Sequence, residues 1–148
     1  MILEERTRIG APPEEVFRYF EEMDSNYEEW HPDHITFRWV EGEGLERGNR
    51  SYFEEVIGGT LMKKTVWYAA VEPDRYIELR PTSRLIRFVL PYISFAFEPD
   101  GEGCRVVQRI KIRTGPIGAR LNRREFDAVR RHMNEEGENL KRILEGGD

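Results

Sequence analysis

The residues best suited to chemistry in this sequence are its histidines, of which there are only three. Two of them lie in the segment Trp30-His31-Pro32-Asp33-His34, where the proline restricts the backbone and so the placement of both imidazole rings. A neutral imidazole is a good zinc ligand. His34 opens a predicted strand and is the better candidate ligand, whereas we expect His31 to have a supporting or surface role. In the alternative interpretation, both are exposed residues that hydrogen-bond the turn backbone.

The third histidine, His132, lies four residues before Glu136 in a predicted C-terminal helix. At about 100° per residue, both side chains fall on the apolar stripe of this helix, which is formed by Phe126, Val129, Met133, Leu140, Ile143 and Leu144. An ionised carboxylate on such a dry face is costly unless a cation or a proton compensates it. Side chains at i and i+4 project from adjacent turns and can aim at one metal ion. The alternatives are a packed histidine and a glutamate paired with one of the many arginines.

A further acidic pair, Glu54 and Glu55, precedes a Gly-Gly turn in a predicted strand. Adjacent strand residues point to opposite faces, so only one of the two can face the protein interior. Phe53 and Ile57 share the face of Glu55 and resemble cavity lining, which favours Glu55. Glu54 stays open as the alternative, and both acids could instead be surface residues paired with nearby basic side chains.

Hydrophobic periodicity indicates which elements must position these residues. We expect a strand over Met1–Ile9, a helix over 12–23, a short helical turn over Tyr27–Trp30 and one long helix over 117–145. Between the helical regions, alternation with a period of two predicts six further strands, at about 34–41, 49–57, 60–72, 75–81, 84–98 and 103–114. An antiparallel sheet with helices on one side must curve around the long helix to bury its apolar face.

This order of elements resembles the START-related helix-grip superfamily, which includes polyketide cyclases, lipid carriers and the birch-pollen allergen type. The opening phrase Ile9-Gly10-Ala11-Pro12-Pro13-Glu14-Glu15-Val16-Phe17 is similar to the entry phrase common in that superfamily. The resemblance implies an α+β fold with about seven antiparallel strands wrapped around the C-terminal helix. It also implies a single domain over residues 1–148 with an internal cavity.

A narrower resemblance rests on three elements: Trp-His-Pro-x-His, a strand glutamate before Gly-Gly, and a late His-x-x-x-Glu. Together they resemble the zinc-dependent diacetylphloroglucinol hydrolase family. That resemblance implies a zinc ion held by His34, Glu55, His132 and Glu136. It also implies a hydrolase that cleaves a carbon–carbon bond beside a ketone by means of a metal-activated water.

The expected ligand is a flat aromatic or polyketide-like molecule held in the internal cavity. His31 and Tyr27 are the candidate catalytic residues, placed near the rim with Trp30 to orient a substrate. Aromatic and aliphatic residues of the strands and the last helix are candidate lining: Phe37, Trp39, Trp67, Phe88, Phe95, Phe97 and Val129. Because aromatic residues in strands are more often core, a non-catalytic carrier and a cyclase-like enzyme stay open as alternatives.

Composition limits the other classes of function. The chain of 148 residues carries 23 basic and 28 acidic side chains, a net charge of −5, which argues against nucleic acid as a partner. Cys104 is the sole cysteine, so an internal disulfide and a cysteine-rich zinc module are excluded. No apolar run approaches a bilayer span and no leader-like segment opens the chain. We therefore expect a cytoplasmic monomer or homodimer with no membrane partner.

Overall fold

The computed structural model describes residues 1–146, which form one curved antiparallel sheet and five helices. The strands are β1 (Ile2–Ile9), β2 (His34–Glu41), β3 (Arg50–Ile57), β4 (Thr60–Glu72), β5 (Tyr76–Pro81), β6 (Tyr92–Asp100) and β7 (Gly103–Lys111). The helices are α1 (Pro13–Glu21), α2 (Met23–Trp30), α3 (Arg84–Val89), α4 (Pro116–Leu121) and α5 (Arg123–Leu144). The strand order β1-β7-β6-β5-β4-β3-β2 and the long α5 confirm the predicted helix-grip fold.

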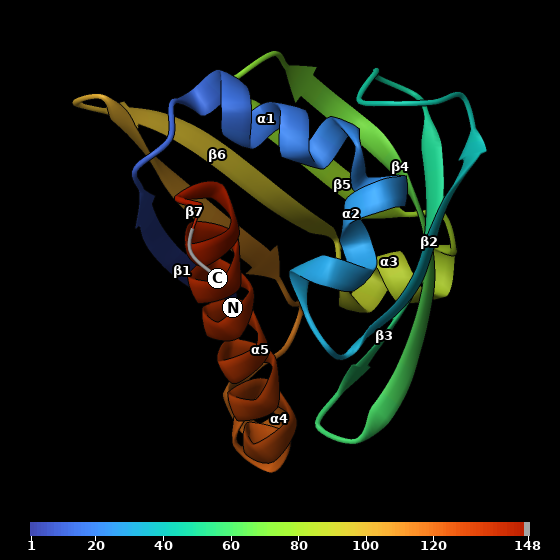
Figure 1. The fold of residues 1–148 in the computed structure, drawn as a ribbon. Helices are drawn as coiled ribbons and strands as arrows, with labels where there is room; N and C mark the ends of the chain where they lie inside the picture. The colour runs from blue at the N-terminus through green and yellow to red at the C-terminus, as the bar shows by residue number, and fades with distance from the viewer. Residues whose placement is uncertain (147–148) are drawn as a thin grey trace.

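The sheet curves from β1, beside α5, around to β2 on the far side of the molecule (Figure 1). Helix α5 approaches β1 so closely that a methyl group at Gly137 would collide with the hydroxyl of Thr7. Helix α2 is tied to α5 by the indole nitrogen of Trp30, which donates to the carbonyl oxygen of Glu136 at 2.9 Å. These contacts fix which side of α5 faces the hollow of the sheet.

The predicted strand over 84–98 is wrong in its first half, where the chain forms the short helix α3 and β6 begins only at Tyr92. The hydroxyl of Ser83 accepts a hydrogen bond from the amide of Ile86 at 3.4 Å and so caps the start of α3. A run of apolar residues this short fits a helix and a strand equally well. The N-cap decides in favour of the helix.

The other predicted boundaries differ in smaller ways. The expected helix over 117–145 is two helices, broken at Asn122, whose side-chain amide donates to the carbonyl oxygen of Gly118 at 2.8 Å. Helix α2 begins at Met23, two residues after the last residue of α1, and is therefore longer than the helical turn predicted over Tyr27–Trp30. Across residues 1–146, none of the helices combines the length and the apolar character needed to cross a bilayer.

Candidate metal centre

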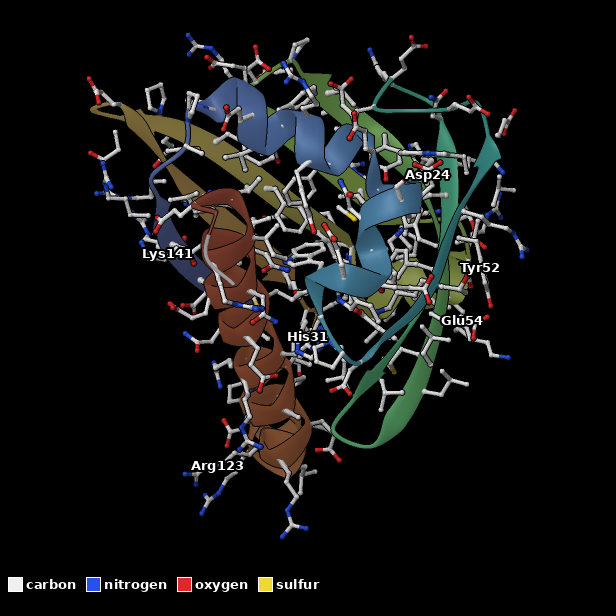
Figure 2. All side chains as sticks on the ribbon, viewed as in Figure 1. Asp24, His31, Tyr52, Glu54, Arg123 and Lys141 are labelled. Atoms are coloured by element: carbon white, nitrogen blue, oxygen red, sulfur yellow. The ribbon has the colours of Figure 1, made fainter. Side chains whose placement is uncertain are left out.

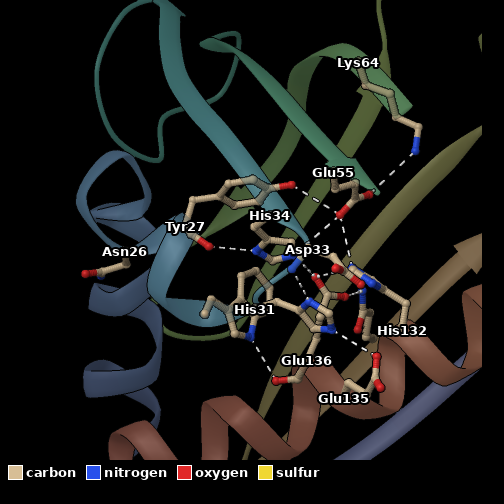
Figure 3. A network of polar contacts seen from close by, with 12 residues as sticks. Asn26, Tyr27, His31, Asp33, His34, Glu55, Lys64, His132, Glu135 and Glu136 are labelled. Atoms are coloured by element: carbon tan, nitrogen blue, oxygen red, sulfur yellow. Dashed lines mark hydrogen bonds and ion pairs between the residues drawn. The ribbon is translucent and has the colours of Figure 1, made fainter. Parts of the chain in front are cut away.

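The four residues proposed as metal ligands lie together in the hollow of the sheet (Figure 3). His34 begins β2 and pairs directly with Glu55 of β3 in the antiparallel register. His132 and Glu136 approach from successive turns of α5. All four residues are buried, and their ligating atoms lie within 4.8 Å of one another.

The distances within this cluster suit a single small cation. Nε2 of His34 lies 2.8 Å from Oε2 of Glu136 and 3.5 Å from Oε2 of Glu55. Nε2 of His132 lies 3.2 Å from Oε2 of Glu55 and 3.4 Å from Oε2 of Glu136. Four tetrahedral bonds of about 2.0–2.2 Å to zinc place neighbouring ligand atoms roughly 3.3–3.6 Å apart. Most of the observed separations fall near that range.

One atom of the cluster is left without a hydrogen bond. Among the buried side-chain nitrogen and oxygen atoms of residues 1–146, only Nε2 of His132 has no hydrogen-bond partner. Native proteins rarely leave a buried polar atom unsatisfied, because its desolvation is then uncompensated. An imidazole nitrogen aimed between two carboxylates is therefore well placed to bind a cation, and the two-histidine, two-glutamate donor set fits zinc.

Further contacts orient His34 for this role. Its Nδ1 lies 2.8 Å from the carbonyl oxygen of Tyr27, so the tautomer that donates there leaves Nε2 free for a ligand. The ring of Tyr27 stacks on the imidazole at 3.9 Å and 7°. The hydroxyl of Tyr27 donates to Oε2 of Glu55 at 3.2 Å. Tyr27 thus positions one ligand from each of two neighbouring strands.

Two polar side chains that the sequence argument did not single out also support the site. Nε2 of Gln108 donates to Oε1 of Glu136 at 3.3 Å. Nζ of the buried Lys64 lies 3.9 Å from Oε1 of Glu55. Each interrupts an otherwise apolar strand face that points inward, and that interruption is the sequence signal that could have identified them.

Within this cluster, His132 and Glu136 each shift the pKa of the other. Burial alone raises the pKa of Glu136, but His132 and His34 outweigh that effect and hold the pKa well below its ordinary value. Burial alone lowers the pKa of His132, but the carboxylates of Glu136 and Glu55 more than offset it and raise the pKa to about 10. Burial, followed by the charges of Glu55 and Glu136, raises the pKa of Tyr27. The two carboxylates create a demand for positive charge that a divalent cation can meet.

His31 does not line the cavity, so it lies apart from the predicted rim position and closer to the predicted supporting one. Its side chain is buried but does not line the cavity. Its Nδ1 accepts from the amide of Asp33 at 2.9 Å, and its Nε2 lies 3.0 Å from Oε1 of the exposed Glu135. Its ring centroid lies 4.3 Å from that of His132. His31 therefore lies behind the cluster, packed against His132.

Glu55 faces the protein interior, as the alternation of residues along the predicted strand favours. Glu55 is buried and faces the cavity, whereas Glu54 accepts a hydrogen bond from the hydroxyl of Tyr52 at 2.7 Å. Figure 2 shows Tyr52 and Glu54 on the outer side of the sheet.

An apolar cavity of about 130 Å³ adjoins the cluster, and Glu55, His132 and Glu136 form part of its wall. Five predicted residues line it: Tyr27, Trp30, Phe37, Phe95 and Val129. Its volume is close to that of a cavity that accepts one benzene-sized molecule. The open side of the cluster therefore faces a space suited to an aromatic ring.

Four predicted lining residues lie elsewhere. Trp39 packs against Phe37 and Tyr68 without reaching the cavity, and Phe97 is core beside Phe17 and Phe20. The guanidinium of Arg87 covers Trp67 at 5.1 Å, and Phe88 is exposed on α3. The prediction for Phe88 is wrong because the residue lies on the helix α3 and not on a strand. The prediction for Trp67 is wrong because its side chain lies on the opposite face of β4 from the buried Val66 and Tyr68.

A family comparison is consistent with this arrangement of cavity and sheet. The model of the family described as polyketide cyclase/dehydrase and lipid transport matches residues 2–145. The chain belongs to this family. Membership of the polyketide cyclase/dehydrase and lipid transport family supports a small hydrophobic ligand in the cavity. A search of curated proteins finds no match.

Solved structures share the fold at low sequence identity. TTHA0849 from Thermus thermophilus aligns with a TM-score of 0.77 and 18% identity, covering 99% of this chain and 98% of the other. Ms6760 from Mycobacterium smegmatis aligns with a TM-score of 0.72 and 14% identity, covering 98% and 91%. The Polyketide_cyc-like protein Cgl2372 from Corynebacterium glutamicum aligns with a TM-score of 0.62 and 19% identity, covering 97% and 91%. These likenesses support the fold alone.

Proposed function

We propose that this protein is a metal-dependent hydrolase of the polyketide cyclase/dehydrase and lipid transport family. Its substrate would be a small aromatic or polyketide-like ketone, and its metal, zinc first, would be bound by His34, Glu55, His132 and Glu136. The observation that carries the proposal is the convergence of four buried ligating atoms beside an apolar cavity. The sequence resemblance to diacetylphloroglucinol hydrolases supports the same ligand set and the same reaction.

The reaction would add one water across the bond between a ring carbon and an acyl carbon. The hydroxyl group ends on the acyl carbon, and the proton ends on the ring carbon. Zinc bound at such a site supplies a Lewis acid for the carbonyl oxygen and a water of lowered pKa. The apolar walls hold the ring and exclude bulk water, which strengthens the electrostatic interactions inside.

Within the cavity, Tyr27 is the protein hydroxyl that we assign to stabilising the developing charge by a hydrogen bond. It lines the cavity, and its hydrogen bond to Oε2 of Glu55 holds it beside the ligand cluster. Because burial raises its pKa, the phenol stays protonated and can donate a hydrogen bond to a developing negative charge. Gln108 fixes the second oxygen of Glu136 and so keeps the other directed at the histidines.

The second candidate function is a carrier that binds a small apolar molecule in the same cavity without converting it. The apolar lining and the family description, which includes lipid transport, favour this alternative. A cyclase-like enzyme would also use the cavity, with a polar acid or base group in place of the metal.

Elemental analysis combined with a turnover assay separates these functions. The hydrolase predicts about one zinc per chain and, with acylated phloroglucinols or related acylphenols, release of the free acid and the deacylated phenol, detected by mass spectrometry. Chelation and Glu136→Gln should both abolish the products, whereas Glu138→Gln, on the exposed side of α5, should not. Metal-free protein that binds acylphenols without turnover would establish the carrier instead.

A further inference from the structure

Two short helices present large apolar side chains to solvent. On α3, Leu85 is 80% exposed and Phe88 is 62% exposed; on α4, Ile117 is 77% exposed and Leu121 is 78% exposed. Spacings of three and four residues place each pair on one side of its helix. Exposure of this extent on two short helices indicates a surface that contacts something apolar.

Arg113 links the end of α3 to the segment that leads into α4. Its amide donates to the carbonyl oxygen of Val89 at 2.7 Å, and its Nε donates to the carbonyl oxygen of Phe88 at 2.9 Å. Its guanidinium also covers the ring of Phe88 at 4.8 Å. Since Arg113 lies three residues before α4 begins at Pro116, the end of α3 and the start of α4 are held near each other. We call the exposed side chains of α3, of α4 and of the first turn of α5, which includes Arg123, the apolar–arginine surface.

The same segments are basic in a chain that is acidic as a whole. Residues 80–91 contain three arginines and no acid, and residues 113–131 contain six arginines and two acids, against a net charge of −5. Arg123 projects from the free end of α5 in Figure 2. The apolar side chains are therefore interleaved with positive charge, which complements an anionic surface.

This surface borders the part of the cavity that reaches solvent. Five cavity-lining residues are only half-buried, and apart from Phe37 on β2 they lie beside the β3–β4 turn, α3 or α5: Ile57, Met62, Leu90 and Val129. Leu90 directly follows α3, and Val129 lies on α5 shortly after α4. A second hollow between the β3–β4 turn and α5 shares Ile57, Met62 and Val129 with the cavity. Ligand entry is thus expected between the β3–β4 turn and the helices that carry the apolar–arginine surface.

We propose that the apolar–arginine surface docks this protein on an anionic lipid bilayer. Leu85, Phe88 and Leu121 would enter the boundary between headgroups and acyl chains, while the arginines contact lipid phosphates. Docking would place the cavity mouth against the bilayer, so that an apolar ligand passes between the two without crossing water. The chain then lies on the membrane and does not span it, in agreement with the lack of a spanning helix among residues 1–146.

A second copy of the chain is the less suitable occupant. A two-fold dimer brings the same patch of both subunits together, which would set arginines against arginines. The sequence predicts no membrane partner because no apolar run is long enough to span a bilayer. A surface that only docks on a bilayer needs no such run, so the length of apolar runs cannot reveal it.

Vesicle sedimentation tests the proposal without reference to the metal or the reaction. The full chain should pellet with phosphatidylcholine vesicles that contain phosphatidylglycerol, much less with phosphatidylcholine alone, and less again as salt is raised. Phe88→Ser combined with Leu121→Ser should weaken binding at least tenfold, because each side chain loses its apolar burial. Arg120→Gln combined with Arg123→Gln should weaken it about fivefold for each arginine removed.

Matched controls keep the result specific to this surface. Val40→Ser on β2, and Arg18→Gln combined with Arg47→Gln, change exposed residues outside the apolar–arginine surface and should bind as the unmodified protein does. Thermal unfolding verifies that every variant is folded, and centrifugation without vesicles corrects for aggregation. Absence of vesicle binding, or equal binding by all variants, would overturn the proposal. A solution dimer that Phe88→Ser and Leu121→Ser dissociate, without any vesicle binding, would overturn it in favour of a second copy.

Discussion

Glu136→Gln should remove most of the stabilisation that zinc gives to the folded protein. The substitution keeps the shape of the side chain but replaces a carboxylate ligand with a neutral amide. In the unmodified protein, free zinc at a thousand times its dissociation constant stabilises the fold by about 4 kcal/mol. For a chain of 148 residues, that corresponds to a rise in Tm of roughly 10 °C.

The size of the loss follows from the position of Glu136. Its Oε2 lies 2.8 Å from Nε2 of His34 and 3.4 Å from Nε2 of His132, so it is the carboxylate oxygen that both histidines share. Loss of an outer contact to a metal ligand already costs about 10- to 100-fold in affinity, and loss of a ligand costs at least the upper value. A hundredfold weaker site leaves about 1.4 kcal/mol at the same zinc concentration, or a Tm shift of roughly 4 °C.

Differential scanning fluorimetry of metal-free protein, with and without zinc, measures this shift. The comparison is made within each variant, so any change in the stability of the metal-free fold cancels. Glu138→Gln, exposed on the same helix, should retain the full response. A zinc response in Glu136→Gln equal to that of the unmodified protein, or none in either, would refute the assignment of the metal centre.

Three further predictions test other parts of the account. Gln108→Leu removes the donor to Oε1 of Glu136 and should weaken zinc binding about 10- to 100-fold in competition with a chromophoric chelator, while the fold is retained. Tyr27→Phe removes the hydroxyl beside Glu55 and should reduce turnover more than zinc content; equal losses of both would contradict a role in stabilising the developing charge. Burial raises the pKa of the Cys104 thiol from 9.0 to about 11, so the native thiol should not react with iodoacetamide at pH 8. Because the unfolded thiol ionises first, the free energy of unfolding should fall as the pH rises from 9.0 to about 11, and less so in Cys104→Ala; equal slopes would contradict that assignment.

The ligand cluster could be anticipated because each of its members breaks a local pattern. Glu136 interrupts the apolar face of a long helix, where periodicity is easiest to recognise. Glu55 shares a strand face with buried apolar residues, and alternation alone separates it from Glu54. Those local patterns do not show that the helix and the strands meet at one point. The prediction that they meet there depends on the resemblance to the helix-grip fold.

The errors came from features that local patterns cannot resolve. Phe88 was assigned to the cavity because four apolar residues in six fit a strand as well as a helix. Trp67 was assigned there by residue type, although its place in the alternation of β4 directs it to the outer face. His31 resembled a rim residue, but its partners, Asp33 and Glu135, are known only once α2 and α5 are placed together.

Anomalous X-ray scattering at the zinc edge, from crystals grown with zinc, locates the metal within the protein. A zinc ion at the four-residue centre gives one strong peak about 2.0–2.2 Å from Nε2 of His34, Nε2 of His132 and a carboxylate oxygen of each of Glu55 and Glu136. A peak between His31, His132 and Glu135, the other group of potential ligands among residues 1–146, would move the centre out of the cavity. No peak at the four predicted atoms would contradict the metal-dependent function.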